Sequence, residues 1–101
     1  MTKTIKAFET AVRAALAQSK AERNPVKRTT HPIAVAGFEG WKARFFLQGL
    51  RNGWDVPAFE LTGPNGKTAR ATNGRLKECC AKAVRGGNGI PTDTIFVTYF
   101  F

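Results

Sequence analysis

Apolar residues recur at three- and four-residue steps in two stretches of the chain, which is the spacing of one face of a helix. Residues 4–22 are expected to form the first helix, which ends at Asn24-Pro25 because the residue before a proline is disfavoured in a helix. Residues 74–85 are expected to form the second, capped by Thr72 or Asn73 and ended by Gly86-Gly87. The predicted buried stripes are Ile5, Phe8, Val12 and Leu16 in the first helix, and Leu76, Cys79, Cys80, Ala83 and Val84 in the second.

Strands are predicted between the two helices and after the second one. Residues 33–38, 41–47, 57–62 and 67–72 carry strand patterns, and turn residues separate them at Glu39-Gly40, Asn52-Gly53 and Gly63-Pro64-Asn65-Gly66. The connector at residues 23–32 contains two prolines and is expected to be extended. Residues 94–101 are apolar at nearly every position, which predicts a central strand covered on both faces.

The order of these elements, α-β-β-β-β-α-β, defines the expected fold class. It is α+β, with a single antiparallel sheet of about four to five strands and two helices packed on one face. A length of 101 residues corresponds to one domain, residues 1–101. A chain of this size buries roughly 60–65% of its unfolded surface, which is enough for a core without disulfides or metals.

The strand at residues 41–47 has the clearest alternation in the chain. Trp41, Ala43, Phe45 and Leu47 are expected to point to one face, and Lys42, Arg44, Phe46 and Gln48 to the other. Cations beside an aromatic ring on a sheet are typical of surfaces that hold single strands, where phosphates meet the cations and a base stacks on the ring. Phe38 is expected to lie diagonally close and to enlarge this platform. The alternative is a solvated strand face with Phe46 under a helix.

The net charge of the chain indicates which class of partner it binds. Sixteen Lys and Arg face seven Asp and Glu, for a formal charge of +9 and a pI near 10.3. An excess of this size on a folded domain indicates an acidic partner. Nucleic acid is the first candidate, because each cation that binds a phosphate releases a counterion and so favours binding. We found no apolar signal core and no stretch near the ~20 apolar residues of a membrane span. The sequence therefore predicts a cytoplasmic, or at least intracellular, protein that does not enter a membrane.

Further candidate residues lie outside that strand. Arg28 belongs to the basic connector, Arg51 and Trp54 flank the Asn52-Gly53 turn, and Arg75 and Lys77 begin the second helix, where cations oppose the helix dipole and suit a docked anion. Lys6, Arg13 and Lys20 recur every seven residues and are expected on the outer face of the first helix. The full set of predicted nucleic-acid-binding residues is Arg28, Lys42, Arg44, Phe46, Arg51, Trp54, Arg75 and Lys77.

The sequence offers little to catalysis or metal binding. The chain has one histidine, His31, which precedes Pro32 in the connector, and its acids form no spaced pair. Cys79 and Cys80 are adjacent and are expected to be buried structural thiols in a reducing compartment. Gly66-Lys67-Thr68 resembles the end of a phosphate-binding loop, but Leu61 stands where that loop needs a glycine. We therefore expect no enzyme, no catalytic residue, no metal and no cofactor.

Two short segments resemble parts of known nucleic-acid binders. Residues 73–84 are similar to the start of the final helix of double-stranded-RNA-binding domains, with Arg75 and Lys77 in place of that family's paired lysines. The predicted strand order before this helix departs from that family. Residues 40–45 are similar to three-stranded sheets that read the major groove of DNA. Each match covers a small part of the chain, so the chain is assigned to neither family.

Two functions from different classes remain open. The first is a non-enzymatic nucleic-acid-binding domain of low sequence specificity, with backbone-dominated contacts and a preference for single-stranded DNA or RNA. The second is a small phage- or plasmid-type inhibitor or adaptor that docks on an acidic surface of a larger complex, with Trp54 and Arg51 as anchors. A structural subunit that self-associates through residues 95–101 is a third possibility, so the oligomeric state stays open.

Overall fold

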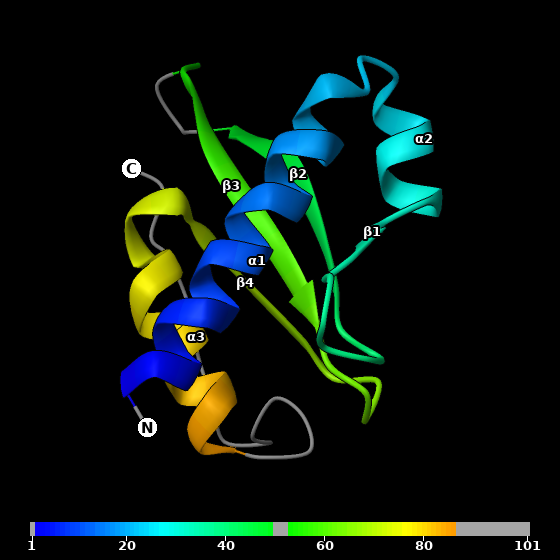
Figure 1. Ribbon diagram of the computed structural model, residues 1–101. Helices are drawn as coiled ribbons and strands as arrows, with labels where there is room; N and C mark the ends of the chain where they lie inside the picture. The colour runs from blue at the N-terminus through cyan, green and yellow to red at the C-terminus, as the bar shows by residue number, and fades with distance from the viewer. Residues whose placement is uncertain (1, 50–52, 87–101) are drawn as a thin grey trace.

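The computed structural model describes residues 2–49 and 53–86, and the structural statements below concern this part of the chain. The elements are α1 (Thr2–Ala21), α2 (Pro25–Thr30), β1 (Ile33–Ala34), β2 (Lys42–Gly49), β3 (Asp55–Thr62), β4 (Thr68–Thr72), a 3₁₀ turn η1 (Asn73–Arg75) and α3 (Leu76–Arg85) (Figure 1). The four strands form one antiparallel sheet in the order β1-β2-β3-β4. The predicted α+β class is confirmed. No described helix is long and apolar enough to cross a bilayer.

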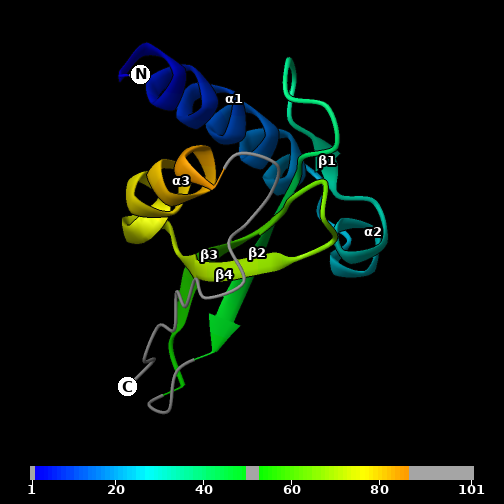
Figure 2. The ribbon, with the colours of Figure 1, turned by 90° about the horizontal axis from the view of Figure 1, so that it is seen from below.

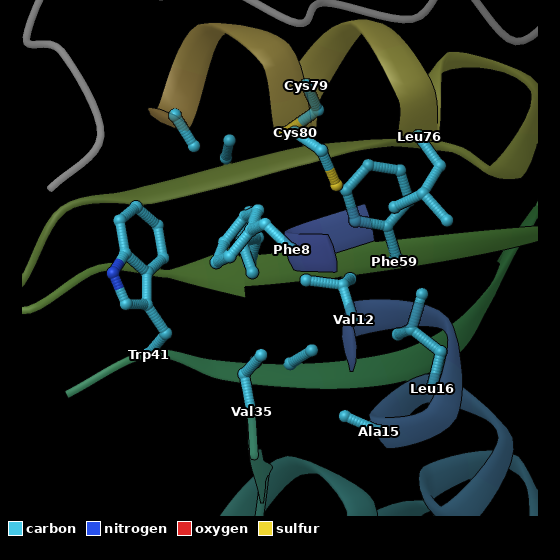
Figure 3. Packing of buried hydrophobic residues seen from close by; sticks show 14 of the residues in the cluster. Phe8, Val12, Ala15, Leu16, Val35, Trp41, Phe59, Leu76, Cys79 and Cys80 are labelled. Atoms are coloured by element: carbon cyan, nitrogen blue, oxygen red, sulfur yellow. The ribbon is translucent and has the colours of Figure 1, made fainter. Parts of the chain in front are cut away.

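Both long helices, α1 and α3, pack on the same side of the sheet (Figure 2). The core consists of the helix stripes and the inward residues of the strands, with Phe8, Phe59 and Leu76 among its largest fully buried side chains. Three of the inward strand positions are alanines, namely Ala43, Ala69 and Ala71. Figure 3 shows the Phe8 ring at the centre of this cluster, with Trp41 on one side and Phe59 on the other.

Phe38 contributes to this core and not to the opposite face of the sheet, so its predicted place on the platform is wrong. Its ring meets Phe8 edge-on, with 4.9 Å between ring centroids, and Trp41 meets Phe8 in the same manner at 5.0 Å. Edge-to-face aromatic pairs of this kind contribute about 0.5–1.5 kcal/mol beyond the area they bury. The loop that carries Phe38 is thereby fixed to α1.

The predicted strand at residues 33–38 shrinks to the two residues of β1. Beyond Ala34 the strand ends and a loop begins. Val35 is buried, and its N–H donates a hydrogen bond to the Trp41 carbonyl oxygen at 2.9 Å, which closes this loop. Gly40 has φ +87°, and a Cβ there would lie 3.0 Å from Pro64. The expected two-residue turn is therefore replaced by a longer loop, and a side chain at position 40 would be strained and would crowd Pro64.

The basic connector is helical where an extended chain was predicted. Asn24 is the N-cap of α2, and its Oδ1 accepts a hydrogen bond from the Val26 N–H at 2.9 Å. Pro25 occupies the first helical position, where its missing N–H costs nothing and its fixed φ suits a helix. The first helix ends at Ala21, before this dipeptide, and Asn24-Pro25 begins the next helix.

Some predicted features are present with shifted ends, and others lie outside the described residues. The turn at residues 63–66 is confirmed by a hydrogen bond from the Gly66 N–H to the Gly63 carbonyl at 3.0 Å. The second helix begins with η1, and neither Thr72 nor Arg75 supplies a side-chain cap. The predicted strand at residues 94–101 and the residue Arg51 lie outside the described residues.

Cys79 and Cys80 are free thiols buried in the core, as predicted. Burial raises the pKa of each thiol to about 12, so both remain protonated at neutral pH. A thiol that does not ionise is a poor nucleophile and a poor metal ligand. The two residues therefore act as small apolar groups that let α3 approach the sheet.

Ser19 is a buried polar side chain near the C-terminal end of α1. Its Oγ accepts a hydrogen bond from the Phe45 N–H at 2.8 Å, across 26 residues of sequence. The short β1 pairs only with Lys42 and Ala43, so it does not extend to Phe45. The serine hydroxyl takes the place of a neighbouring strand at that position and ties α1 to β2.

We predict that Ser19→Ala lowers the free energy of unfolding by about 1–3 kcal/mol, because the buried Phe45 N–H loses its acceptor. Urea denaturation measures the change. Gln18→Ala, an exposed neighbour on the same helix, is the matched control and should stay within about 0.5 kcal/mol of the wild type. Equal stability of the two variants would show that the hydrogen bond does not hold the strand.

Candidate nucleic-acid interface

One side of the sheet is turned away from α1 and α3 (Figure 2). The predicted polar residues of β2 lie on this side and form three cross-strand rows with β3 and β4. The strand register aligns Lys42 with Thr62 and Thr68 in the first row. The second row is Arg44, Glu60 and Arg70, and the third is Phe46, Ala58 and Thr72. We call these nine residues the outer sheet face. The alternation predicted for β2 is confirmed from Lys42 to Phe46, since Ala43 and Phe45 are buried on the helix side.

Glu60 joins two arginines on the outer sheet face. Its Oε1 accepts from the Nε of Arg44 at 2.9 Å, and its Oε2 accepts from the Nε of Arg70 at 2.6 Å. Burial alone would raise the pKa of Glu60, but the hydrogen bonds and positive charges of Arg44 and Arg70 together hold it below its usual value of 4.5. The three side chains form one cluster of net charge +1 that spans β2, β3 and β4.

Arg44 is held within this cluster, and little of its side chain reaches solvent. Its side chain is only 12% exposed, and its guanidinium carbon lies 4.9 Å from the centroid of the Phe46 ring. Phe46 is half-buried, and Ala58 beside it in the third row is fully buried. The cations that reach solvent on this face are Lys42 and Arg70, whose side chain is 64% exposed. Arg44 and Arg70 thus share the Glu60 carboxylate.

The remaining predicted residues lie on other surfaces. Arg28 sits in α2 with its guanidinium carbon 5.4 Å from the centroid of Phe45, and the Lys20 Nζ is 5.6 Å from the same ring. Arg75 and Lys77 lie at the start of α3, on the helix side, where an Nη1 of Arg75 is 3.8 Å from Glu78. The structure therefore brings together Lys42, Arg44 and Phe46 but separates them from Arg28, Arg75 and Lys77.

Trp54 stands just before β3 and is 69% exposed. Leu47, near the end of β2, is 53% exposed although it lies on the helix side of the sheet. The end of β2 and the start of β3 extend away from α1 and α3 (Figure 2). This hairpin end presents large apolar side chains to solvent.

Sequence reasoning missed Arg70 and Glu60 as part of the face. The signal was available in the hairpin around the turn at residues 63–66, since folding that turn places residue 60 opposite residue 70. The register with β2, which adds Arg44, depends on the longer loop between β2 and β3 and could not be read from turn residues alone. The cluster is therefore a property of three strands together.

Comparison of the chain with protein-family models, with curated proteins and with solved structures gives no match. Within residues 2–49 and 53–86, no group of three His, Cys, Asp or Glu side chains is placed to hold a metal ion. The described surface carries exposed cations and hydroxyls, a few exposed apolar side chains, and exposed carboxylates and an imidazole such as Glu39 and His31.

We predict that Glu60→Gln makes the protein less stable at pH 7 by about 1–3 kcal/mol, because two arginines lose their charged acceptor. A lowered pKa in the folded state gives stability that is present above pH 4.5 and is lost as the pH falls through the folded value. The wild type should therefore lose stability below pH 4.5 more steeply than Glu60→Gln. Thermal unfolding between pH 3 and 7 measures both effects.

Glu39→Gln, at an exposed position, is the control. Its loss of stability between pH 7 and pH 3 should match that of the wild type. Parallel pH profiles of the wild type and Glu60→Gln would mean that the cluster does not stabilise the sheet.

Proposed function

We propose that this protein is a non-enzymatic nucleic-acid-binding domain whose outer sheet face contacts the phosphate backbone. The observation that carries the proposal is the arrangement of the first two rows, where exposed Lys42 and Arg70 stand on either side of β3 with the threonines of the first row near them. Cations and hydroxyls are the groups that bind phosphate oxygens. The anchored Glu60 cluster holds Arg70 in one place, which lowers the entropy lost on binding.

Backbone contact fits this face better than base stacking on Phe46. The ring already lies against the Arg44 guanidinium, and its neighbour Ala58 is fully buried. A base would have to displace Arg44 from both Phe46 and Glu60 to reach the ring. Binding should therefore depend on salt and vary little with sequence.

Trp54 supports a preference for single strands. It is the most exposed large apolar side chain of the described residues, and unpaired bases stack on such rings with about 1–3 kcal/mol per base. Bases in a duplex are already stacked on one another and gain less. The proposed ligand is therefore single-stranded DNA or RNA, held by Lys42 and Arg70 and stacked at Trp54.

We predict that Lys42→Ala with Arg70→Gln lowers affinity for single-stranded oligonucleotides and reduces the slope of log affinity against log salt by about one to two units. Glutamine at position 70 keeps an amide donor for Glu60 and preserves the cluster. Fluorescence anisotropy between 50 and 300 mM salt gives the slope. Lys82→Ala with Arg85→Gln, which removes two exposed charges from α3, should leave a larger slope than the sheet variant.

A wild-type protein that fails to bind any oligonucleotide at 50 mM salt would overturn the proposed function. An unchanged slope in the sheet variant would place the contact on another surface.

We also predict that Trp54→Ala weakens binding of single strands about five- to fiftyfold, which corresponds to roughly 1–2.5 kcal/mol for one lost base stack. Binding of duplex DNA should change by less than about twofold. The Trp54→Phe variant retains a ring and should recover most of the affinity. Equal losses for single-stranded and duplex ligands would contradict stacking at this residue.

A protein partner with an acidic surface is the second candidate function. The exposed Leu47 and Trp54 favour it, because an aliphatic side chain has little use on a phosphate backbone and is ordinary at a protein interface. The Lys20 and Arg28 side chains on the Phe45 ring would supply charge complementary to acidic residues of that partner. Purification free of nucleic acid at low salt, with a low ratio of absorbance at 260 to 280 nm, would favour this candidate.

A further inference from the structure

A groove of about 420 Å³ lies between α1 and α3, on the helix side of the sheet. It is lined by Ile5, Lys6, Glu9, Thr10, Arg13 and Lys77. Lys6 and Arg13 are one heptad apart on α1, so they lie on the same face of that helix, and Lys77 reaches the groove from the first turn of α3. Two helices far apart in sequence thus bring three cations to one hollow.

The groove carries a net positive charge after its internal ion pair is counted. The Oε2 of Glu9 accepts a hydrogen bond from the Nε of Arg13 at 2.9 Å, and the Arg13 Nη2 forms an ion pair with the same oxygen at 2.9 Å. The charges of this pair cancel, and the guanidinium keeps further N–H donors. Lys6 and Lys77 then give the groove an excess of +2, and the exposed Thr10 adds a hydroxyl that can donate.

This set of groups fits a phosphate and lacks what a nucleoside needs. Six side chains line the hollow, none is aromatic, and Ile5 is the one aliphatic group among them. Two ammonium groups, a held guanidinium and a hydroxyl bind a dianionic or backbone phosphate through charge-assisted hydrogen bonds. A base would find no ring on which to stack.

The groove and the outer sheet face lie on opposite sides of the sheet, with the core between them (Figures 1 and 2). A helix is about 10–12 Å across, and the sheet adds to this thickness, so more than about 10 Å separates the two surfaces. A strand held on one surface reaches the other only by passing around the edge of the molecule.

We propose that the groove between α1 and α3 is a second phosphate-backbone site, so that one protein molecule holds two nucleic-acid segments at once. This proposal rests on the proposed function of the outer sheet face. The protein would then join two strands, or two distant parts of one strand, across its own thickness. Joining of segments is a distinct activity from binding of one.

The test uses two non-complementary oligonucleotides of roughly eight nucleotides, within the range of site sizes for single binding domains. One carries a fluorescence donor and the other an acceptor. With wild-type protein we expect energy transfer at low salt, and sedimentation should show a complex of one protein with two oligonucleotides. Lys6→Ala with Lys77→Ala should abolish transfer and leave the anisotropy-measured affinity for the first oligonucleotide within about threefold.

Lys82→Ala with Arg85→Gln removes the same charge from α3 outside the groove lining and should retain transfer. Circular dichroism confirms that all variants are folded, which is expected because the substituted side chains are exposed.

A failure of the proposed function and a failure of the second site give different results in this experiment. No rise in anisotropy for either oligonucleotide would overturn the proposed function of the outer sheet face. Normal anisotropy without energy transfer would overturn the second site alone. Transfer that survives in Lys6→Ala with Lys77→Ala, or that comes from complexes of two protein molecules, would also overturn it.

Discussion

The close approach of two helices to one face of the sheet is the constraint on which the structure depends. It requires small residues where the layers meet, and the sheet supplies Ala43, Ala69 and Ala71 on its inner face. Cys79, Cys80 and Ala83 do the same on α3, while the large Phe8 and Phe59 fill the space between α1 and the sheet. Larger residues at the alanine positions would force side chains off their rotamers or push the helices outward.

The packing of both long helices on one face of the sheet also determines where charged side chains lie. Because both long helices cover the same face, the opposite face of β2, β3 and β4 is free to carry Lys42, Arg70 and their neighbours. The long helices carry further exposed cations, among them Lys6 and Lys77, and α2 carries Lys27 and Arg28. The described cations are thus spread over the outer sheet face, the long helices and α2, and the core separates the sheet face from the helices.

The periodic parts of the fold could be predicted from the sequence, because burial imposes a period on each element. The stripe of Phe8, Val12 and Leu16 identified α1, and the alternation around Ala43 and Phe45 identified β2. The strand at residues 33–38 was wrong beyond Ala34, because Val35 and Phe38 are apolar for packing on α1 and not for strand pairing. Apolar content alone does not separate these two uses.

The candidate site was predicted less completely than the fold. Lys42, Arg44 and Phe46 share a face as expected, but the partner of Arg44 comes from β3 and its role follows from that partner. A prediction from one strand alone treats every cation as available to a ligand. In the structure Glu60 pairs with both arginines, and the Arg44 side chain is mostly buried while the Arg70 side chain is exposed. Nucleic-acid binding itself stays a prediction that the proposed measurements can decide.

The hydrogen bond between Ser19 and Phe45 has a consequence for association between chains. A strand at the rim of a sheet is a template on which another chain can add a strand, and a two-residue β1 leaves most of β2 at such a rim. The serine hydroxyl occupies the Phe45 N–H, and Arg28 of α2 lies over the same residue. The end of α1 and the short helix α2 therefore cover the edge of β2 at Phe45 without adding another strand to the sheet.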